Sequence, residues 1–151
     1  MDQTISVTIP VFNEENNIEP LYNKLVSVLD NMHFNYEIIL INDGSSDAGP
    51  SIMNRLSEQD EKLKIIHFKR NFGQTAAMMA GFDYADGDII IPMDADLQND
   101  PEDIPRLIEK LAQGFDVCSG WRKNRKDSTF KRVLVSRAAN KLISTISGVR
   151  L

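Results

Sequence analysis

The segment Asp88-Ile89-Ile90-Ile91-Pro92-Met93-Asp94-Ala95-Asp96-Leu97-Gln98 joins an apolar run directly to an acidic one. The run over residues 88–93 is typical of a buried strand. In an extended backbone, residues two apart project to the same side, so Asp94, Asp96 and Gln98 are expected to converge on one point. Hard oxygen ligands suit Mg²⁺ or Mn²⁺, which complete their shells with water and substrate phosphates. The spacing therefore predicts a divalent-metal site.

This segment begins the fourth of a series of strand-then-helix units, each about 25 to 30 residues long. Strands are expected over residues 5–11, 36–41, 63–68, 88–93 and 115–120. Helices are expected from Ile18 to Met32 with Asn16 or Asn17 as the N-cap, through 52–56, over 75–84, from Pro101 to a stop at Gly114, and over about 130–147. The alternation predicts an α/β fold with a mostly parallel, right-handedly wound sheet and helices on both faces.

Polar residues follow each expected strand. Ligands of open α/β sheets bind at the carboxyl ends of the strands, so these residues are candidates for one site. They are Asn13 and Glu14, then Asp43, then Lys69 and Arg70, then residues 94–98, then Arg122.

The segments after the second and third strands have a second interpretation. Directly after Asp43, Ser45, Ser46 and Asp47 are ordinary turn residues, and Asp47 would cap the next helix. Asp43, the first residue after its strand, is instead expected to accept a hydrogen bond from a base or a ribose hydroxyl. The pair Lys69-Arg70 is either a phosphate contact or a solvated pair.

The charge distribution is uneven. Residues 122–141 hold eight basic residues and one acid, a net +7, whereas the rest of the chain carries −12. This argues against general nucleic-acid binding and for one local anionic partner, either a phosphorylated substrate or an anionic membrane surface. With 151 residues and no membrane-length apolar run or signal peptide, we expect one soluble, cytosolic domain.

The sequence lacks the motifs of several other classes of enzyme and binding site. No GxGxxG follows the first strand and no GxxxxGK[ST] occurs, which argues against a dinucleotide dehydrogenase and a P-loop NTPase. His33 and His67 are isolated and are interpreted as structural. The single cysteine, Cys118, is predicted to be a small core residue.

Four motifs in order carry a family resemblance: residues 9–14 (IPVFNE), 41–47 (INDGSSD), 70–74 (RNFGQ) and 94–98 (DADLQ). Together they resemble the family 2 glycosyltransferases with the GT-A fold, a Rossmann-like sheet. Within that family the chain most resembles the polyprenyl-phosphate glycosyltransferases, such as dolichyl-phosphate mannose synthases, bactoprenol glucosyltransferases and undecaprenyl-phosphate formamido-arabinose transferases. The likeness covers nearly the whole chain.

The resemblance implies roles for individual residues. The nucleotide sugar would contact Pro10, Val11, Asn13, Glu14, Asp43, Lys69, Arg70, Asp94 and Ala95. Mg²⁺ or Mn²⁺ would be held by Asp94, Asp96 and Gln98, with Asp96 and Arg122 as the catalytic residues. Arg122, Arg132 and Arg137 would approach the acceptor phosphate.

The resemblance also implies a division of the chain. Residues up to about 98 would form the nucleotide-binding half, and residues 99–151 the start of an acceptor half that continues in a longer protein. Core edges left by such a truncation would favour a homo-oligomer.

The reaction implied is inverting transfer of a sugar from a UDP- or GDP-linked donor to a polyprenyl phosphate, by an enzyme at the inner face of the cell membrane. An alternative is transfer to a saccharide hydroxyl in cell-wall or capsule polysaccharide synthesis. A nucleotidyltransferase would show a Gly-rich loop after the first strand, which residues 13–17 lack. A phosphoacceptor receiver domain would carry an aspartate where this chain has Lys69 and Arg70.

Overall fold

The computed structural model describes residues 3–120, and residues through Asp116 form one compact unit. Its strands are β1 (Thr4–Val11), β2 (Asn35–Asn42), β3 (Leu63–His67) and β4 (Ile89–Pro92). Its helices are α1 (Glu15–Leu29), α2 (Gly49–Ser57), α3 (Gln74–Tyr84), the 3₁₀ turn η1 (Pro101–Asp103) and α4 (Ile104–Leu111). Within residues 3–120, no helix has the length and apolar character needed to cross a membrane.

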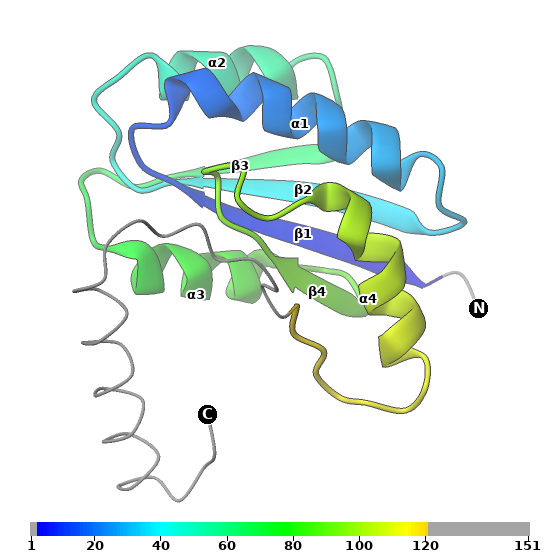
Figure 1. Cartoon of the computed structure of the whole chain (residues 1–151). Helices are drawn as coiled ribbons and strands as arrows, with labels where there is room; N and C mark the ends of the chain where they lie inside the picture. The colour runs from blue at the N-terminus through cyan, green and yellow to red at the C-terminus, as the bar shows by residue number, and fades with distance from the viewer. Residues whose placement is uncertain (1–2, 121–151) are drawn as a thin grey trace, which may run out of the picture. The chain divides into compact units, whose positions relative to one another are not determined.

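The four strands form one sheet in the order β3-β2-β1-β4, and every neighbouring pair is parallel (Figure 1). The connections β1-α1-β2, β2-α2-β3 and β3-α3-β4 are the crossover units that parallel pairing requires. The predicted α/β class with a parallel sheet is confirmed.

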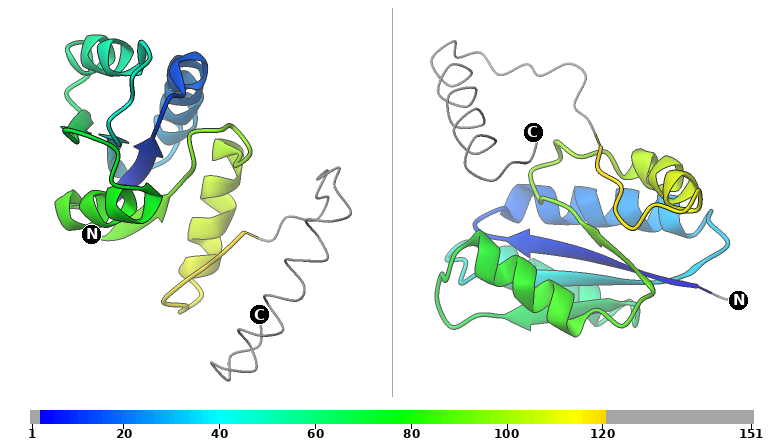
Figure 2. Two further views of the ribbon diagram at one scale, coloured as in Figure 1. Left: turned by 90° about the vertical axis from the view of Figure 1, so that its left-hand side faces the viewer. Right: turned by 90° about the horizontal axis from the view of Figure 1, so that it is seen from below.

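Helices cover both faces of the sheet, as Figures 1 and 2 show for α1 and α2 on one side and α3 on the other. The larger core lies on the α1 and α2 side and also takes Ile104 and Ile108 from α4. Alternate residues of the two central strands supply its sheet face: Ile5, Val7, Ile9, Val11, Ile38 and Leu40.

On the α3 face, β2 contributes Ile39 and Ile41, whereas the contact between β1 and α3 is built from smaller side chains. Here β1 presents Ser6 and Thr8, both buried, and α3 presents Ala77 and Gly81. A Cβ added to Gly81 would lie 3.0 Å from the Thr8 Cβ atom, so the backbone of α3 lies unusually close to the sheet. This packing fixes the position of α3, whose first residue faces the pocket described below.

Helix α1 begins at Glu15, earlier than predicted, because its first turn is capped from another loop. The Glu15 N–H donates to Asp47 Oδ2 at 2.9 Å, and the Glu15 carboxylate accepts from the Ala48 N–H at 2.8 Å. Asn16 and Asn17 consequently lie inside the helix rather than at its N-cap. Asp47 also accepts from the Gly49 N–H at the start of α2, as expected for a capping residue.

The fifth strand predicted over residues 115–120 is wrong. None of the described strands pairs with this segment, and an apolar run without a partner has no ladder to join. Phe115 and Val117 are 53% and 83% exposed, and Cys118 is only half-buried rather than a core residue. The helix predicted over about 130–147 lies outside the described residues.

A buried polar network stabilises the end of the sheet where the strands begin. Glu37, on β2, accepts from the Ser6 hydroxyl at 2.5 Å and from the Asp86 N–H at 2.8 Å. Lys64 forms ion pairs with Glu37 at 2.6 Å and Asp86 at 2.8 Å, and Ser6 Oγ accepts from the Gly87 N–H. The network holds the turn between α3 and β4 against the sheet.

The pKa of Glu37 reflects this environment. Burial raises it, but hydrogen bonds from Lys64, Ser6 and the Asp86 N–H outweigh burial, so the pKa lies below its ordinary value. The ionised carboxylate is therefore the form that favours the folded chain.

Replacing Glu37 by alanine should lower the free energy of unfolding by about 2 to 4 kcal/mol, because buried donors lose their acceptor. Denaturant unfolding monitored by circular dichroism measures the change. Glu61→Ala is the matched control: Glu61 is exposed and shows no side-chain partner among residues 3–120, so its change should stay within about 0.5 kcal/mol.

The difference in unfolding free energy between the wild type and Glu37→Ala should also depend on pH. The folded-state pKa of Glu37 is depressed, so the contribution of its carboxylate to the free energy of unfolding is complete above the ordinary pKa of 4.5. That contribution is lost as the pH falls through the folded-state pKa. The stability gap between wild type and Glu37→Ala should therefore narrow on acidification. A gap independent of pH would contradict a role for the carboxylate charge.

Candidate functional site

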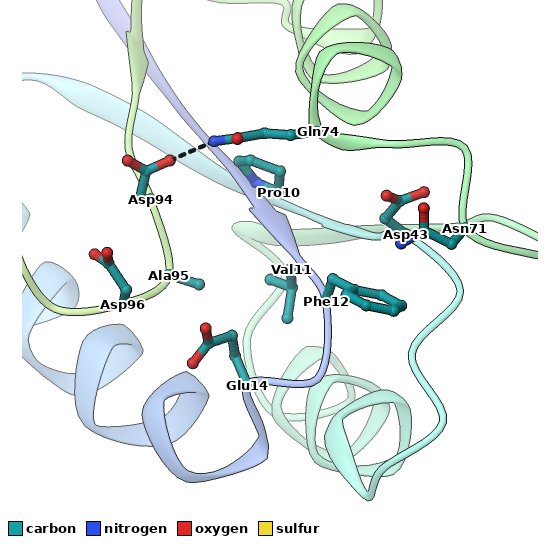
Figure 3. A pocket seen from close by; sticks show the side chains of 10 residues that line it. All are labelled: Pro10, Val11, Phe12, Glu14, Asp43, Asn71, Gln74, Asp94, Ala95 and Asp96. Atoms are coloured by element: carbon teal, nitrogen blue, oxygen red, sulfur yellow. Dashed lines mark hydrogen bonds between the residues drawn. The ribbon is translucent and has the colours of Figure 1, made fainter. Parts of the chain in front are cut away.

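A pocket of about 400 Å³ opens where β1, β2 and β4 end and α3 begins (Figure 3). The chain first builds β2 and β3 on one side of β1 and then places β4 on the other side, so the strand order reverses beside β1. Such a switch point is where open α/β sheets bind ligands. Ten residues line the pocket: Pro10, Val11, Phe12, Glu14, Asp43, Asn71, Gln74, Asp94, Ala95 and Asp96.

Asp43 is the most buried acid of this pocket, with 3% of its surface exposed. Its Oδ1 atom accepts from the Phe72 N–H at 2.7 Å, and its Oδ2 atom accepts from the Gly73 N–H at 3.0 Å. Each carboxylate oxygen has a further lone pair, so Asp43 can anchor this loop and still accept a hydrogen bond from a ligand. Figure 3 shows it beside Asn71 and Phe12 on one side of the pocket.

The glycine after Asp43 allows two loops to touch. Gly44 has a φ of +69°, and a Cβ added there would lie 2.3 Å from the carbonyl carbon of Arg70. Any side chain at this position would push the turn after β2 away from the loop before α3. The close approach is therefore part of how Asp43 reaches the Phe72 and Gly73 amides.

The loop after β1 is tied to the same turn. Asn13, at φ 55°, donates its N–H to Ser45 Oγ at 3.0 Å, and its Oδ1 atom accepts from the Ser46 N–H at 2.9 Å. Asn13 does not line the pocket; it fixes the loop that presents Phe12 and Glu14 to it. Ser45 and Ser46 thus make the turn contacts expected of them.

The acidic segment forms a turn, not the extended backbone that the spacing argument assumed. Leu97 has a φ of +60°, and the Gln98 N–H donates to Asp96 Oδ1 at 3.0 Å. The prediction that Asp94, Asp96 and Gln98 project to the same side of an extended backbone is therefore wrong. Asp94 and Asp96 nevertheless both line the pocket, and the Asp94 Oδ1 atom accepts from Gln74 Nε2 at 2.8 Å.

The far end of this segment is held to helix α1. Lys24 pairs with Asp100 at 2.9 Å, and Asp100 also accepts from the Glu102 N–H at 3.0 Å. The hydrogen bond from Glu102 and the ion pair with Lys24 lower the pKa of Asp100. The acidic turn thus has a fixed attachment at each end, β4 before it and η1 after it.

The two carboxylates fit a divalent cation that a substrate would complete. Among residues 3–120 no three His, Cys, Asp or Glu side chains converge as a full ligand set. Mg²⁺ and Mn²⁺ do not require one, because they are commonly held by one or two carboxylates together with water and substrate phosphates. Asp94 and Asp96 supply that donor set on one wall of the pocket.

Seven of the predicted site residues come together in the pocket: Pro10, Val11, Glu14, Asp43, Asp94, Ala95 and Asp96. Asn13, Lys69, Arg70 and Gln98 are not among its lining residues. Arg70 instead lies over the Phe72 ring, with its Cζ atom 4.6 Å from the ring centroid. Arg122, Arg132 and Arg137 lie outside the described residues.

Three lining residues were not predicted as site residues: Phe12, Asn71 and Gln74. All three belong to motifs that were recognised, either directly after β1 or at the start of α3. Their position at strand ends was the available signal. Neither a phenylalanine nor an amide, however, stands out by its chemistry from the many such residues in loops.

A comparison with protein families decides the classification. The family described as "Glycosyl transferase family 2" matches residues 6–150. The chain belongs to glycosyl transferase family 2.

Curated relatives of this family 2 chain match it over nearly its whole length. The undecaprenyl-phosphate 4-deoxy-4-formamido-L-arabinose transferase of Aeromonas hydrophila is 43% identical over 148 residues, which are 97% of this chain and 45% of the relative. The dodecaprenyl-phosphate galacturonate synthase of Rhizobium johnstonii is 44% identical over 97% of this chain and 44% of its own length. The chain thus spans less than half the length of these relatives.

Solved structures share the fold of this glycosyltransferase chain. A glucosyl-3-phosphoglycerate synthase from Mycobacterium tuberculosis, in complex with UDP, superposes with a TM-score of 0.68 at 23% identity, covering 97% of this chain and 51% of that one. A mannosyltransferase from Pyrobaculum calidifontis, in complex with GDP-mannose and Mn²⁺, superposes with a TM-score of 0.64 at 23% identity. The match covers 74% of this chain and 33% of that one. The predicted family and GT-A fold are confirmed.

Substituting Gly44 by alanine should lower the free energy of unfolding by about 2 kcal/mol or more, since backbone strain at positive φ adds to the clash with Arg70. Gly114→Ala is the matched control, because Gly114 has a φ of +96° and open space around it. Both variants place an alanine at a positive φ, but only Gly44→Ala also brings a Cβ atom against the Arg70 backbone. Equal losses in denaturant unfolding would show that the contact between the two loops contributes nothing.

Proposed function

We propose that this chain is the donor-binding part of an inverting glycosyltransferase that moves a sugar from a UDP- or GDP-linked donor to a polyprenyl phosphate, with Mg²⁺ or Mn²⁺. Residues 1–98 would form the nucleotide-binding half, and residues 99–151 would begin the acceptor half.

The observation that carries the proposal is the charge of the pocket. Four of its ten described lining residues are acids, Glu14, Asp43, Asp94 and Asp96, and none of the ten is basic. A nucleoside diphosphate is itself anionic, so it would be repelled unless a cation came with it. An acidic pocket at a sheet switch point therefore suits a metal–nucleotide complex better than a free anion.

The two sides of the pocket suit the two ends of such a donor. Asp43, Asn71 and Phe12 offer acceptors, a donor and an aromatic ring where a nucleoside would bind. Asp94 and Asp96 offer carboxylates on the other side, where a cation bridging the diphosphate would be held. Gln98, whose N–H contacts Asp96, stays a candidate third ligand.

A bound divalent cation would stabilise the charge that develops on the leaving diphosphate. The protein residues would orient the donor and hold that cation through Asp94 and Asp96. A phosphate acceptor is already ionised near neutral pH, so no strong general base is required of the chain.

The proposed acceptor rests on the relatives and on the basic segment. Both named relatives are, by name, enzymes of undecaprenyl or dodecaprenyl phosphates. Residues 122–141 carry a net charge of +7, and we propose that Arg122, Arg132 and Arg137 bind the lipid phosphate. Basic residues near an anionic membrane contribute about 1 kcal/mol each to binding, so the same segment would hold the enzyme at the inner face of the cell membrane.

Replacing Asp96 by alanine should abolish the Mn²⁺-dependent part of UDP or GDP binding, because one of the two proposed carboxylate ligands is lost. Isothermal titration calorimetry with and without Mn²⁺ measures that part directly. Asp83→Ala, an exposed aspartate on α3, is the control and should bind as the wild type does. Wild-type affinity in Asp96→Ala with Mn²⁺ present would refute the metal assignment.

In the full-length enzyme, Arg132→Ala together with Arg137→Ala should reduce sugar transfer to polyprenyl phosphate by about 10-fold or more while leaving donor binding unchanged. A radiolabelled-sugar transfer assay with a short polyprenyl phosphate checks this. If the double variant transfers to lipid phosphate at the wild-type rate, the acceptor assignment is wrong. Transfer by the wild type to a saccharide hydroxyl only would instead support the polysaccharide alternative.

A further inference from the structure

We infer that Gln74 is a positioning residue, which holds the Asp94 carboxylate in the orientation that receives the metal–nucleotide complex. Its Nε2 atom donates to Asp94 Oδ1 at 2.8 Å, across the pocket from the first turn of α3 to the loop after β4 (Figure 3). The two residues are 20 positions apart in the chain. The inference rests on the proposed function, since it concerns the same carboxylate.

Gln74 projects from a rigid support. It is the first residue of α3, and the Gly73 N–H directly before it donates to the buried Asp43 carboxylate. The body of α3 lies close to β1 through Gly81, where a Cβ atom would contact Thr8 at 3.0 Å. Gln74 itself is exposed, so its orientation depends on this fixed backbone together with the hydrogen bond to Asp94.

Asp94 needs such a partner more than its neighbours do. It is half-buried and follows the end of β4, at the entrance to the turn that Leu97 completes with a positive φ. Of its two oxygens, Oδ1 accepts from Gln74, a contact that restrains rotation of the carboxylate and leaves Oδ2 available to a ligand. Asp96, by contrast, is oriented within its own turn by the Gln98 N–H.

An amide is suited to this task because it orients without neutralising. A lysine or arginine in the same place would pair with Asp94 and cancel the charge that a divalent cation requires. A neutral donor leaves the full negative charge on the carboxylate. Partners that orient metal ligands in this manner typically contribute 10- to 100-fold to metal affinity.

The contact also joins the two sides of the pocket. The Phe72 and Gly73 amides hold Asp43 on the nucleoside side, and Gln74, the next residue, holds Asp94 on the other side. Three consecutive residues thus connect the carboxylates that the proposal assigns to opposite ends of the donor.

The test compares Gln74→Met, which keeps the length of the side chain but cannot donate, with Gln59→Met at an exposed glutamine in the turn after α2. GDP and UDP are titrated by calorimetry into each full chain with and without Mn²⁺. Gln74→Met should weaken the Mn²⁺-dependent affinity by about 10- to 100-fold and leave metal-free affinity within about threefold, whereas Gln59→Met should match the wild type.

A double-mutant cycle with Asp94→Ala, which removes the acceptor of the hydrogen bond, separates positioning from a general effect on the fold. If Gln74 acts through Asp94, Gln74→Met should change the affinity less than about twofold in the Asp94→Ala background. Loss of metal-free and metal-dependent affinity in equal measure, or a full effect in that background, would overturn the inference while the proposed function stands. Absence of any Mn²⁺-dependent binding by the wild type would overturn both.

Discussion

The pocket depends on one buried carboxylate, Asp43, and on the two backbone amides that satisfy it. A charge this deeply buried is costly unless hydrogen bonds compensate it, and here the Phe72 and Gly73 amides do so just before α3. Each hydrogen bond to a charged group contributes about 1.5 to 3 kcal/mol, and the helix N-terminus adds a favourable dipole. Because Asp43 directly follows β2, this contact fixes the loop before α3 relative to the sheet, and with it Asn71 and Gln74.

The parts of the fold that were predictable are those determined by neighbouring residues. Strand β2 is the clearest example: Ile38, Ile39, Leu40 and Ile41 form a continuous apolar run, as a parallel strand covered on both faces requires. The amphipathic period of α4 is equally local, since its buried residues Ile104 and Ile108 are four positions apart and share one face of the helix. That polar loops follow these strands at one edge of the sheet is a consequence of parallel pairing, so the location of the site was predictable too.

Most of the parts that were not predictable depend on partners distant in sequence or on missing partners, and one depends on a local hydrogen bond that competes with an extended backbone. Asn13 is of a residue type that often binds ligands. Its side-chain oxygen instead accepts from the Ser46 N–H, 33 residues away, and so stabilises the loop. Helix α1 begins where Asp47, 32 residues from Glu15, can cap it. The run at 115–120 has a strand-like composition but no strand beside it in the described chain. Alternation at 94–98 predicted one shared face, and a local hydrogen bond from Gln98 to Asp96 turned the backbone instead.

The turn at 94–98 changes how the metal site should be understood. A fully formed site with three carboxylates would hold a cation tightly whether or not the donor was present. Among the described residues no third ligand converges with Asp94 and Asp96, so on the proposed function they would make a weaker site whose remaining positions the diphosphate would fill. On the proposed function, cation and donor then bind as a unit, and the acidic pocket discriminates against a free nucleotide through charge repulsion. The proposed acceptor is also an anion, and the +7 segment at 122–141 carries opposite charges suited to it. On this proposal the two anionic substrates would each meet a different source of positive charge, a divalent cation for the donor and arginines for the acceptor, which would reduce the repulsion between nucleophile and leaving group as they approach.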